Sequence, residues 1–366
     1  MQKMEAATKQ NSADIDQQQL AEPRDTYKIA YIIHFLLGAG NLLPWNALIT
    51  GVDYFGYLYP GRHVEKVFSV AYMGSSVLVL IVVMSFGGWS KFLSFKLRMN
   101  LGFSMFVLSL MVPPTIDWIW GDVRNSNKVY QERAYFLTVA SVVICGLADG
   151  LIGGSLIGSA GKLPKQYMQA VFAGTASSGV LVCLLRIITK ASLPQTPQGL
   201  RTSAHFYFIV SSTILLCCIL SCALLYKLPV MQQHYKNLNN EPFYSKPKYR
   251  AVAKKIQWPA VGKALTAIYL VKSIKKAGWS CFGRLLFYPL FAACLHYGPK
   301  WLKTEVPVMV LTFMLGLTNG YLTSVVMILA PKSVPVSEAE LSAIVMVVFL
   351  GFGLVGGSVL GWFWII

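Results

Sequence analysis

The stretch IAYIIHFLLGAGNLLPWNALIT, residues 29–50, decides the fold class of this chain. It is long enough to cross a bilayer, since about 20 apolar residues span roughly 30 Å of hydrocarbon. Pro44, Trp45 and Asn46 interrupt the apolar run at mid-depth. Because a proline removes a helical hydrogen bond and an amide needs a partner, both are tolerated there only beside protein or a wet cavity. The face that carries them is therefore predicted to line a path or a site.

The composition places the rest of the chain in the same class. Of the 366 residues, 55% are hydrophobic and 13% are charged, and the mean hydropathy is +0.54. Soluble domains carry about 25% charged residues, so the composition indicates a polytopic membrane protein. The net charge of +17 does not indicate nucleic acid binding here, because most basic residues lie in short connections between apolar runs. The seven cysteines show no zinc-type spacing, and no metal or cofactor is expected.

Nine apolar runs are long enough to be full spans. They cover residues 29–50, 67–88, 97–118, 134–160, 167–190, 204–226, 282–298, 305–330 and 339–366. A tenth run, residues 261–271, is only about 16 Å long as a helix. The expected fold is an all-α polytopic bundle with about nine full spans and one half-length helix.

Four regions follow from these runs. They are a disordered cytosolic tail (1–26), a six-helix bundle (27–226), a basic cytosolic linker (227–260) and a shorter C-terminal bundle (261–366). The tail lacks the basic start and short apolar core of a signal peptide. Basic residues fall on the cytosolic side if the N-terminus is cytosolic, as the positive-inside rule requires.

Few residues suggest chemistry. Asp149 lies deep in the fourth run, where an ionised carboxylate is costly and usually functional or paired. Arg186 lies about 10 Å away in depth by helical rise, and we expect it to reach outward near Lys190. The small-residue pairs Gly154/Gly158, Gly316/Gly320 and Gly357/Gly361 predict close helix approach. The sequence contains no strong catalytic motif, so an enzyme is not expected.

Several stretches together resemble one family. They are GAGNLLPWN (38–46), GSLIGSAGKLP (154–164), TNGY (318–321), APKSV (330–334) and EAELSAIVMVVFLGFGLVGGSV (338–359). In this order they resemble equilibrative nucleoside transporters, particularly the plant branch, and the resemblance covers about residues 26–366.

The resemblance implies a fold related to the major facilitator bundle, with eleven spans and a cytosolic N-terminus. It implies that nucleosides such as adenosine and uridine, and some nucleobases, cross the bilayer by alternating access, either equilibratively or coupled to protons. The plasma membrane is the expected location, with the vacuolar membrane as the alternative. No nucleic acid partner is expected, and the oligomeric state stays open.

The family pattern also places substrate-binding residues. They match Leu42, Trp45, Ile49, Met73, Lys263 and Leu354 here. An indole and aliphatic walls suit a nucleobase, which has an apolar face and polar edges. Asn46, Asp149 and Asn319 are expected to be structural or to lie along the transport path.

The chain departs from the family at two places. Gly153 stands where the family commonly has a glutamine, and Pro259 stands where it has an aspartate four residues before the cation Lys263. The family's seventh span and the first half of its eighth are missing between about Trp258 and Val261. Two hypotheses follow: a working transporter, or a transport-inactive truncated variant that acts by association with full-length relatives.

Overall fold

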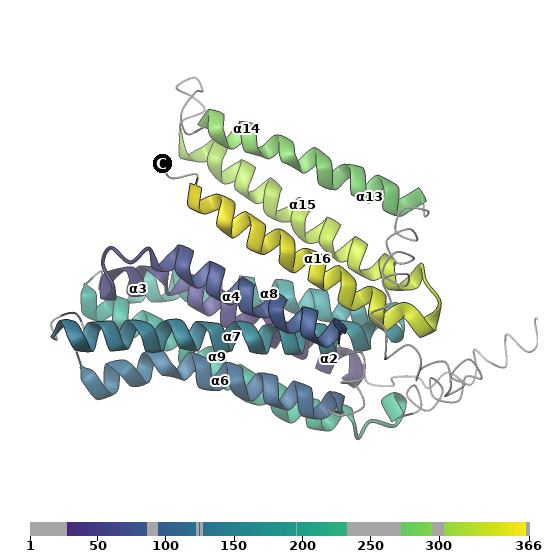
Figure 1. Ribbon diagram of the computed structural model, residues 1–366, viewed down its shortest axis with the longest axis horizontal. Coiled ribbons are helices and arrows are strands. Elements are labelled where there is room, and N and C mark those ends of the chain that lie inside the picture. The colour runs from purple at the N-terminus through teal and green to yellow at the C-terminus, as the bar shows by residue number, and fades with distance from the viewer. Residues whose placement is uncertain are drawn as a thin grey trace, which may run out of the picture.

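The computed structural model describes residues 28–85, 94–121, 124, 127–194, 196–232, 272–294 and 304–363. Every regular element within these ranges is helical (Figure 1). Eight of the helices described are long and apolar enough to cross a membrane. They are α2 (Ile29–Thr50), α4 (Val64–Ser85), α6 (Phe95–Trp120), α7 (Lys128–Lys162), α8 (Lys165–Ser192), α9 (Pro197–Leu225), α15 (Glu305–Lys332) and α16 (Val336–Phe363). The protein is therefore an all-α polytopic membrane protein.

The span expected at residues 282–298 differs from the prediction. Helical structure already begins at Lys272 and consists of α13 (Lys272–Gly283), the 3₁₀ turn η2 (Arg284–Leu286) and α14 (Phe287–Ala292). Pro289 explains the tighter turn, because it has no N–H to donate to the carbonyl of Leu285. The predicted half-helix at 261–271 lies outside the described residues.

The helix α2 continues through Pro44, although the proline removes one internal hydrogen bond. Neighbouring helices pack closely against α2 at Gly38 and Gly40, just before Pro44. A Cβ added at Gly38 would lie 2.1 Å from the carbonyl oxygen of Val171 in α8, and one at Gly40 would lie 2.5 Å from Cys218 Sγ in α9. Packing on both sides therefore stabilises a helix that lacks one internal hydrogen bond.

Helices α2, α4, α6, α7, α8 and α9 form a six-helix layer. Within it α2 packs mainly against α8 and α9, α4 against α7, and α6 against α7 and α9. The short helix α3 (Val52–Leu58) joins α2 to α4 at one end, which we call the α3 end. The opposite end carries the α7–α8 and α15–α16 turns with Lys162, Lys165 and Lys332, and we call it the basic end.

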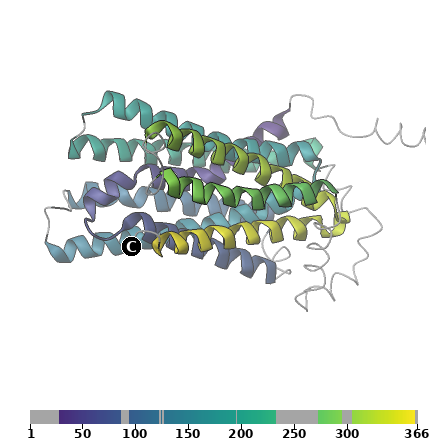
Figure 2. The same ribbon diagram turned by 90° about the horizontal axis from the view of Figure 1, so that it is seen from above.

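The segments α13 to α16 form a second, three-helix layer that runs alongside the first (Figures 1 and 2). Only α16 packs extensively on the six-helix layer, against α4 and α7, while α15 makes fewer contacts with α7 and α8. In the most apolar stretch of 18 consecutive residues, 56% of the residues are buried in α2 but only 17% in α15. The values of the two layers overlap, with 22% in α8 and 28% in α16, but α15 is the least enclosed of the eight spans described.

The three glycine pairs behave differently from one another. Gly154 and Gly158 approach other helices as predicted, since an added Cβ would lie 3.0 Å from Leu80 Cδ2 and 3.2 Å from Ile344 Cγ1, respectively. For the other two pairs the prediction of close approach is wrong among the described residues. An added Cβ meets nothing there within 4 Å at Gly316, Gly320, Gly357 and Gly361.

The two layers are linked at the basic end. The Lys162 ammonium forms an ion pair with the Glu340 carboxylate of α16. From α15, Lys332 Nζ donates to the carbonyl of Leu163 over 2.7 Å. At the α3 end, Lys66 Nζ lies 5.8 Å from the Trp362 ring centroid, which is a weaker kind of link.

Candidate functional site

Trp45 lies at the centre of the candidate site. Its half-buried indole packs on Tyr72 of α4, with ring centroids 4.5 Å apart and planes tilted by 32°. A cavity of about 180 Å³ opens beside it. The cavity is lined by Trp45, Leu48, Ile49, Val52, Glu65, Phe68 and Ser69. The structure thus brings together two of the predicted substrate residues, Trp45 and Ile49, in a space smaller than the usual 300–1,000 Å³ of a ligand pocket.

Asp149 lies next to this aromatic pair. Its Oδ2 accepts a hydrogen bond of 2.7 Å from Ser76 Oγ, one turn along α4 from Tyr72. The glycines of α7 explain this proximity, because a Cβ added at Gly150 would lie 2.4 Å from the Ser76 carbonyl oxygen. The Tyr72 hydroxyl is buried close to the same carboxylate and interacts with it. A polar cluster of Tyr72, Ser76 and Asp149 therefore lies beside the Trp45 ring.

Asn46 has a different surrounding from Trp45. Its Nδ2 donates to Ser178 Oγ in α8 over 2.9 Å, and that hydroxyl donates to the carbonyl of Thr175 over 2.7 Å. Asn46 therefore ties α2 to α8, and it is not among the residues that line the Trp45 cavity.

The remaining predicted substrate residues lie around this region or outside the described part of the chain. Met73 is half-buried and follows Tyr72 directly. A Cβ added at Gly351 would lie 2.5 Å from Val77 Cγ2, and this contact brings Leu354, one turn farther along the antiparallel α16, near the level of Met73. Leu354 is 45% exposed, and Leu42 is half-buried one turn before Trp45. Lys263 is not among the described residues.

Asn319 lies in the three-helix layer. Its Oδ1 accepts a hydrogen bond of 2.7 Å from Arg284 Nη1, which joins α15 to η2. The structure does not bring Asn319 to the Trp45 cavity.

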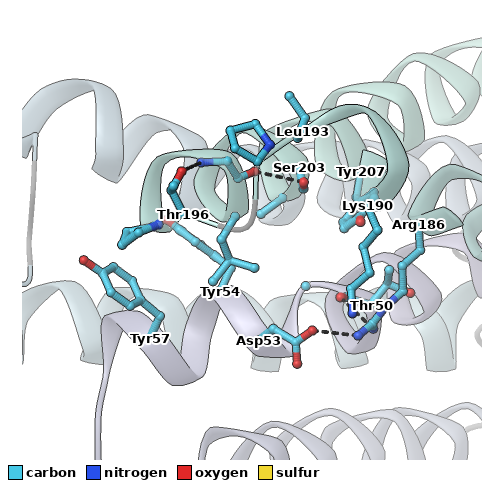
Figure 3. A pocket seen from close by; sticks show the side chains of 16 residues that line it. Thr50, Asp53, Tyr54, Tyr57, Arg186, Lys190, Leu193, Thr196, Ser203 and Tyr207 are labelled. Atoms are coloured by element: carbon cyan, nitrogen blue, oxygen red, sulfur yellow. Dashed lines mark hydrogen bonds and ion pairs between the residues drawn. The ribbon is translucent and has the colours of Figure 1, made fainter. Parts of the chain in front are cut away.

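A larger cavity, of about 260 Å³, lies at the α3 end between α2–α3 and α8–α9 (Figure 3). Arg186 reaches across it, donating to Asp53 Oδ2 over 2.6 Å and to the Thr50 carbonyl over 3.2 Å. The Arg186 guanidinium thus donates to a carbonyl at the C-terminal end of α2. It does not pair with Asp149, in agreement with the outward direction expected for Arg186. None of the predicted substrate residues lines this cavity, and it lies within one layer, so we do not identify it as the candidate site.

Sequence reasoning missed Asn41. Its side chain is only 9% exposed, and its Oδ1 is buried without a hydrogen-bond partner in the described residues. It lies one helical turn before Trp45, so the two side chains share a face of α2. That spacing is the signal that could have identified it.

The arrangement is suited to binding a flat, partly polar molecule. Aromatic rings stack on nucleobases, and a carboxylate and an amide can pair with polar edges or hydroxyl groups. In the part of the chain that the structure describes, no group of three or more His, Cys, Asp or Glu side chains could hold a metal ion.

Comparison with known proteins supplies the family. A family model described as nucleoside transporter matches residues 139–255 and 256–366. Equilibrative nucleotide transporter 8 of Arabidopsis thaliana is 60% identical over 389 aligned positions, which cover 94% of this chain and 97% of the relative. Equilibrative nucleotide transporter 1 of the same plant is 42% identical over 401 positions, covering 94% and 88%. Transporter 7 is 26% identical over 408 positions, covering 92% and 95%.

The alignments are longer than the part of this chain that they contain. Since 94% of 366 residues is about 344, the 389 positions shared with transporter 8 include about 45 without a residue from this chain. The two family matches meet at residues 255 and 256, close to Trp258. These relatives are named as transporters. The chain is therefore an integral membrane protein that belongs to the nucleoside transporter family.

Proposed function

We propose that this chain carries nucleosides across a membrane by alternating access, with the Trp45 cavity as part of the binding site. The observation that supports this best is the Trp45–Tyr72 pair beside the Asp149–Ser76 hydrogen bond, on the side of the six-helix layer that α16 covers. A base can pack on the rings while ribose hydroxyls donate to the carboxylate. Because a carboxylate repels phosphate, the arrangement favours nucleosides such as adenosine and uridine over nucleotides.

The links between the layers support the proposed transport cycle. The Lys162–Glu340 ion pair and the Lys332–Leu163 hydrogen bond join the layers at the basic end. At the α3 end, α16 is exposed along much of its last two turns. We infer that this arrangement is closed at the basic end, and that rocking about the site closes the α3 end in turn.

The orientation follows from the same charges. We infer that the basic end and the N-terminus are cytosolic, which makes the present arrangement outward-facing in the plasma membrane. The bundles at 27–226 and 261–366 would then move relative to each other, with residues 227–260 as their link. Uptake measured at pH 5.5 and 7.5 distinguishes equilibrative transport from proton coupling.

Uptake of labelled adenosine and uridine into transporter-deficient cells tests the proposal. Trp45→Ala removes a stacking surface worth about 1–3 kcal/mol per base, so we expect uptake to fall about tenfold or more. Trp118→Ala is the matched control, because Trp118 is 59% exposed on α6 and lies away from the cavity. Equal loss in both variants, at equal surface expression, contradicts a role for Trp45 in binding.

A second candidate function is an inactive variant that associates with full-length relatives. The roughly 45 aligned positions without a residue in this chain, and the family matches that meet at residues 255 and 256, support a missing segment. Uptake no greater than in empty-vector cells, despite correct membrane insertion, would eliminate the first function. Changed uptake by a co-expressed full-length relative would then support the second.

Two further tests address the missing segment itself. Pro259→Asp alone should not restore transport to an inactive chain, because one carboxylate does not replace a whole span. Comparison of genomic and transcript sequences around Trp258 shows whether an exon has been skipped.

A further inference from the structure

Asn41 has a hydrogen-bonding atom that the fold does not use. The side chain is 9% exposed, and its Oδ1 is buried without a partner in the residues that the structure describes. Buried acceptors are rarely left unpaired, because their desolvation is costly. Asn41 does not line the Trp45 cavity itself, but it lies one helical turn from Trp45, which does, so a donor on a bound ligand can pair with this acceptor.

The surroundings of this amide leave room for such a donor. Asn41 faces Gly153 of α7, where an added Cβ would lie 3.9 Å from both Oδ1 and Nδ2 and meets no other described atom within 4 Å. By contrast, a Cβ at Gly174 would lie 1.9 Å from the carbonyl oxygen of Phe35. The contact at Gly153 is therefore loose, while the α2–α8 contact is tight.

Asn41 also has the correct position relative to the aromatic pair. It lies four residues before Trp45, and Asp149 lies four residues before Gly153, so each pair shares a face of its helix. Since α2 and α7 run in opposite directions, Asn41 and Gly153 each lie about one helical turn nearer the basic end than Trp45 and Asp149 do. A base packed on Trp45 would present one edge toward the Asn41 amide.

We propose that Asn41 reads the hydrogen-bonding edge of a nucleobase bound against Trp45, a role that rests on the proposed nucleoside transport. An amide offers one acceptor beside one donor. Adenine pairs with such a group through its amino group and a ring nitrogen, and the imide edge of uracil matches it in the same way. Guanine instead presents two adjacent donors, which a carboxylate accepts better than an amide does.

This difference allows a test that measures the preference among nucleosides as well as the rate of uptake. The uptake of adenosine, uridine and guanosine is measured for the wild type, Asn41→Ala and Asn41→Asp. We expect Asn41→Ala to raise the KM for adenosine and uridine about tenfold, the effect of losing one bidentate base contact. Asn41→Asp should shift the ratio of guanosine to adenosine uptake about fivefold or more toward guanosine.

Asn100 in α6 provides the matched control. Its Oδ1 is likewise buried without a described partner, but Asn100 lies in α6, which contributes no residue to the Trp45 cavity, whereas Asn41 lies one turn from Trp45 in α2. Asn100→Asp should leave the ratio of guanosine to adenosine uptake unchanged. Thermal unfolding of each purified variant, with and without nucleoside, separates lost binding from lost folding.

The outcomes are distinct. A wild type that transports, with Asn41 variants whose KM values and base ratio are unchanged, overturns the role of Asn41 while the proposed function stands. An equal ratio shift in Asn100→Asp also overturns it. A wild type that neither transports nor is stabilised by any nucleoside overturns the proposed function, and the role of Asn41 with it.

Discussion

The six-helix and three-helix layers consist of similarly apolar helices, yet they pack very differently. In the most apolar stretch of 18 consecutive residues, α2 has 56% of its residues buried, against 17% in α15. Lipid is as apolar as leucine, so hydrophobicity alone does not drive helices together inside a bilayer. Close packing at small residues does, and the two layers differ in how their glycines are used.

The glycine contacts make this difference concrete. In the six-helix layer, a Cβ added at Gly38, Gly146 or Gly174 would lie within 2.1 Å of a backbone or side-chain oxygen of the next helix. In the three-helix layer, Gly316 and Gly320 face no described atom within 4 Å. The first layer is therefore a fitted interface, whereas α16 alone attaches much of the second layer to it.

The largest expected effect comes from filling a fitted glycine. Gly38→Ala places its Cβ 2.1 Å from the Val171 carbonyl oxygen, so α2 and α8 must separate. Overpacking usually costs 1–3 kcal/mol, and we expect about 3 kcal/mol or more here because the obstacle is backbone. Thermal unfolding in lipid nanodiscs measures this loss of stability.

Gly316→Ala is the matched change in the other layer, where the added methyl meets nothing described within 4 Å. We expect its effect to stay within about 0.5 kcal/mol. Equal destabilisation by the two substitutions would show that the layers do not differ in this way.

The second-largest loss of stability is expected at alkaline pH, at the α3 end of the six-helix layer. Tyr59 follows α3 and shares a hydrogen bond of 2.9 Å with Thr138 Oγ1, and burial raises its pKa from about 10 to about 12. A raised phenol pKa means that the folded state prefers the neutral form. Its contribution is complete below pH 10 and is lost as pH rises toward 12, by up to about 2–3 kcal/mol. Burial also raises the pKa of Tyr54, which acts in the same direction.

Melting temperatures measured from pH 8 to 11.5 check this prediction. Tyr59→Phe should cost about 1 kcal/mol at neutral pH and make the alkaline fall shallower. Tyr321→Phe is the comparison in the three-helix layer, since that ring is 69% exposed, and it should leave the fall unchanged. A fall that is identical with and without the Tyr59 hydroxyl contradicts its assignment.

The sequence predicts positions along the membrane normal better than rotations about a helix axis. The run 67–88 corresponds to α4 (Val64–Ser85), because hydropathy follows bilayer thickness directly. The run 134–160 is shorter than α7 (Lys128–Lys162), since the helix continues into polar residues beyond the hydrocarbon. Apolar runs therefore give membrane depth, and they do not give helix ends.

Partners across helices could not be predicted in the same way. The motif containing Trp45 indicated a lined site, but the bond from Ser76 to Asp149 depends on how α4 and α7 are rotated against each other. That rotation results from Gly146 and Gly150, which admit the α4 backbone. A single sequence shows these glycines without showing which helix they face.

A moderate effect is expected at the link between the layers. Lys162 and Glu340 have side chains only 21% and 26% exposed, so reversing one charge leaves two partly buried like charges together. Lys162→Glu should cost about 1–2 kcal/mol, and Lys162→Glu with Glu340→Lys should recover part of it. Lys66→Glu, at the weaker link near Trp362, should cost less than about 0.5 kcal/mol.

Cysteine crosslinking reports the same link directly. A Cβ added at Gly161 would lie 3.1 Å from Ala343 Cβ, so cysteines at both positions are close enough to form a disulfide. Lys162→Glu should lower the yield of this crosslink. Unchanged crosslinking would mean that glycine packing alone holds the basic end closed.

The smallest effect is expected inside the three-helix layer. Asn319→Ala removes the acceptor of the 2.7 Å hydrogen bond from Arg284, and we expect a loss of about 1 kcal/mol because the pair is not enclosed by other helices. Asn319→Asp should increase stability, since it replaces a neutral acceptor with a charged one. A double-mutant cycle with Arg284→Gln, read by thermal unfolding in nanodiscs, isolates the interaction. Asn319→Ala should destabilise the protein less than Gly38→Ala does if this comparison is correct. Equal destabilisation would mean that the three-helix layer depends on a polar contact as strongly as the six-helix layer depends on its glycines. The exposure of a residue would then be a poor guide to its contribution to stability.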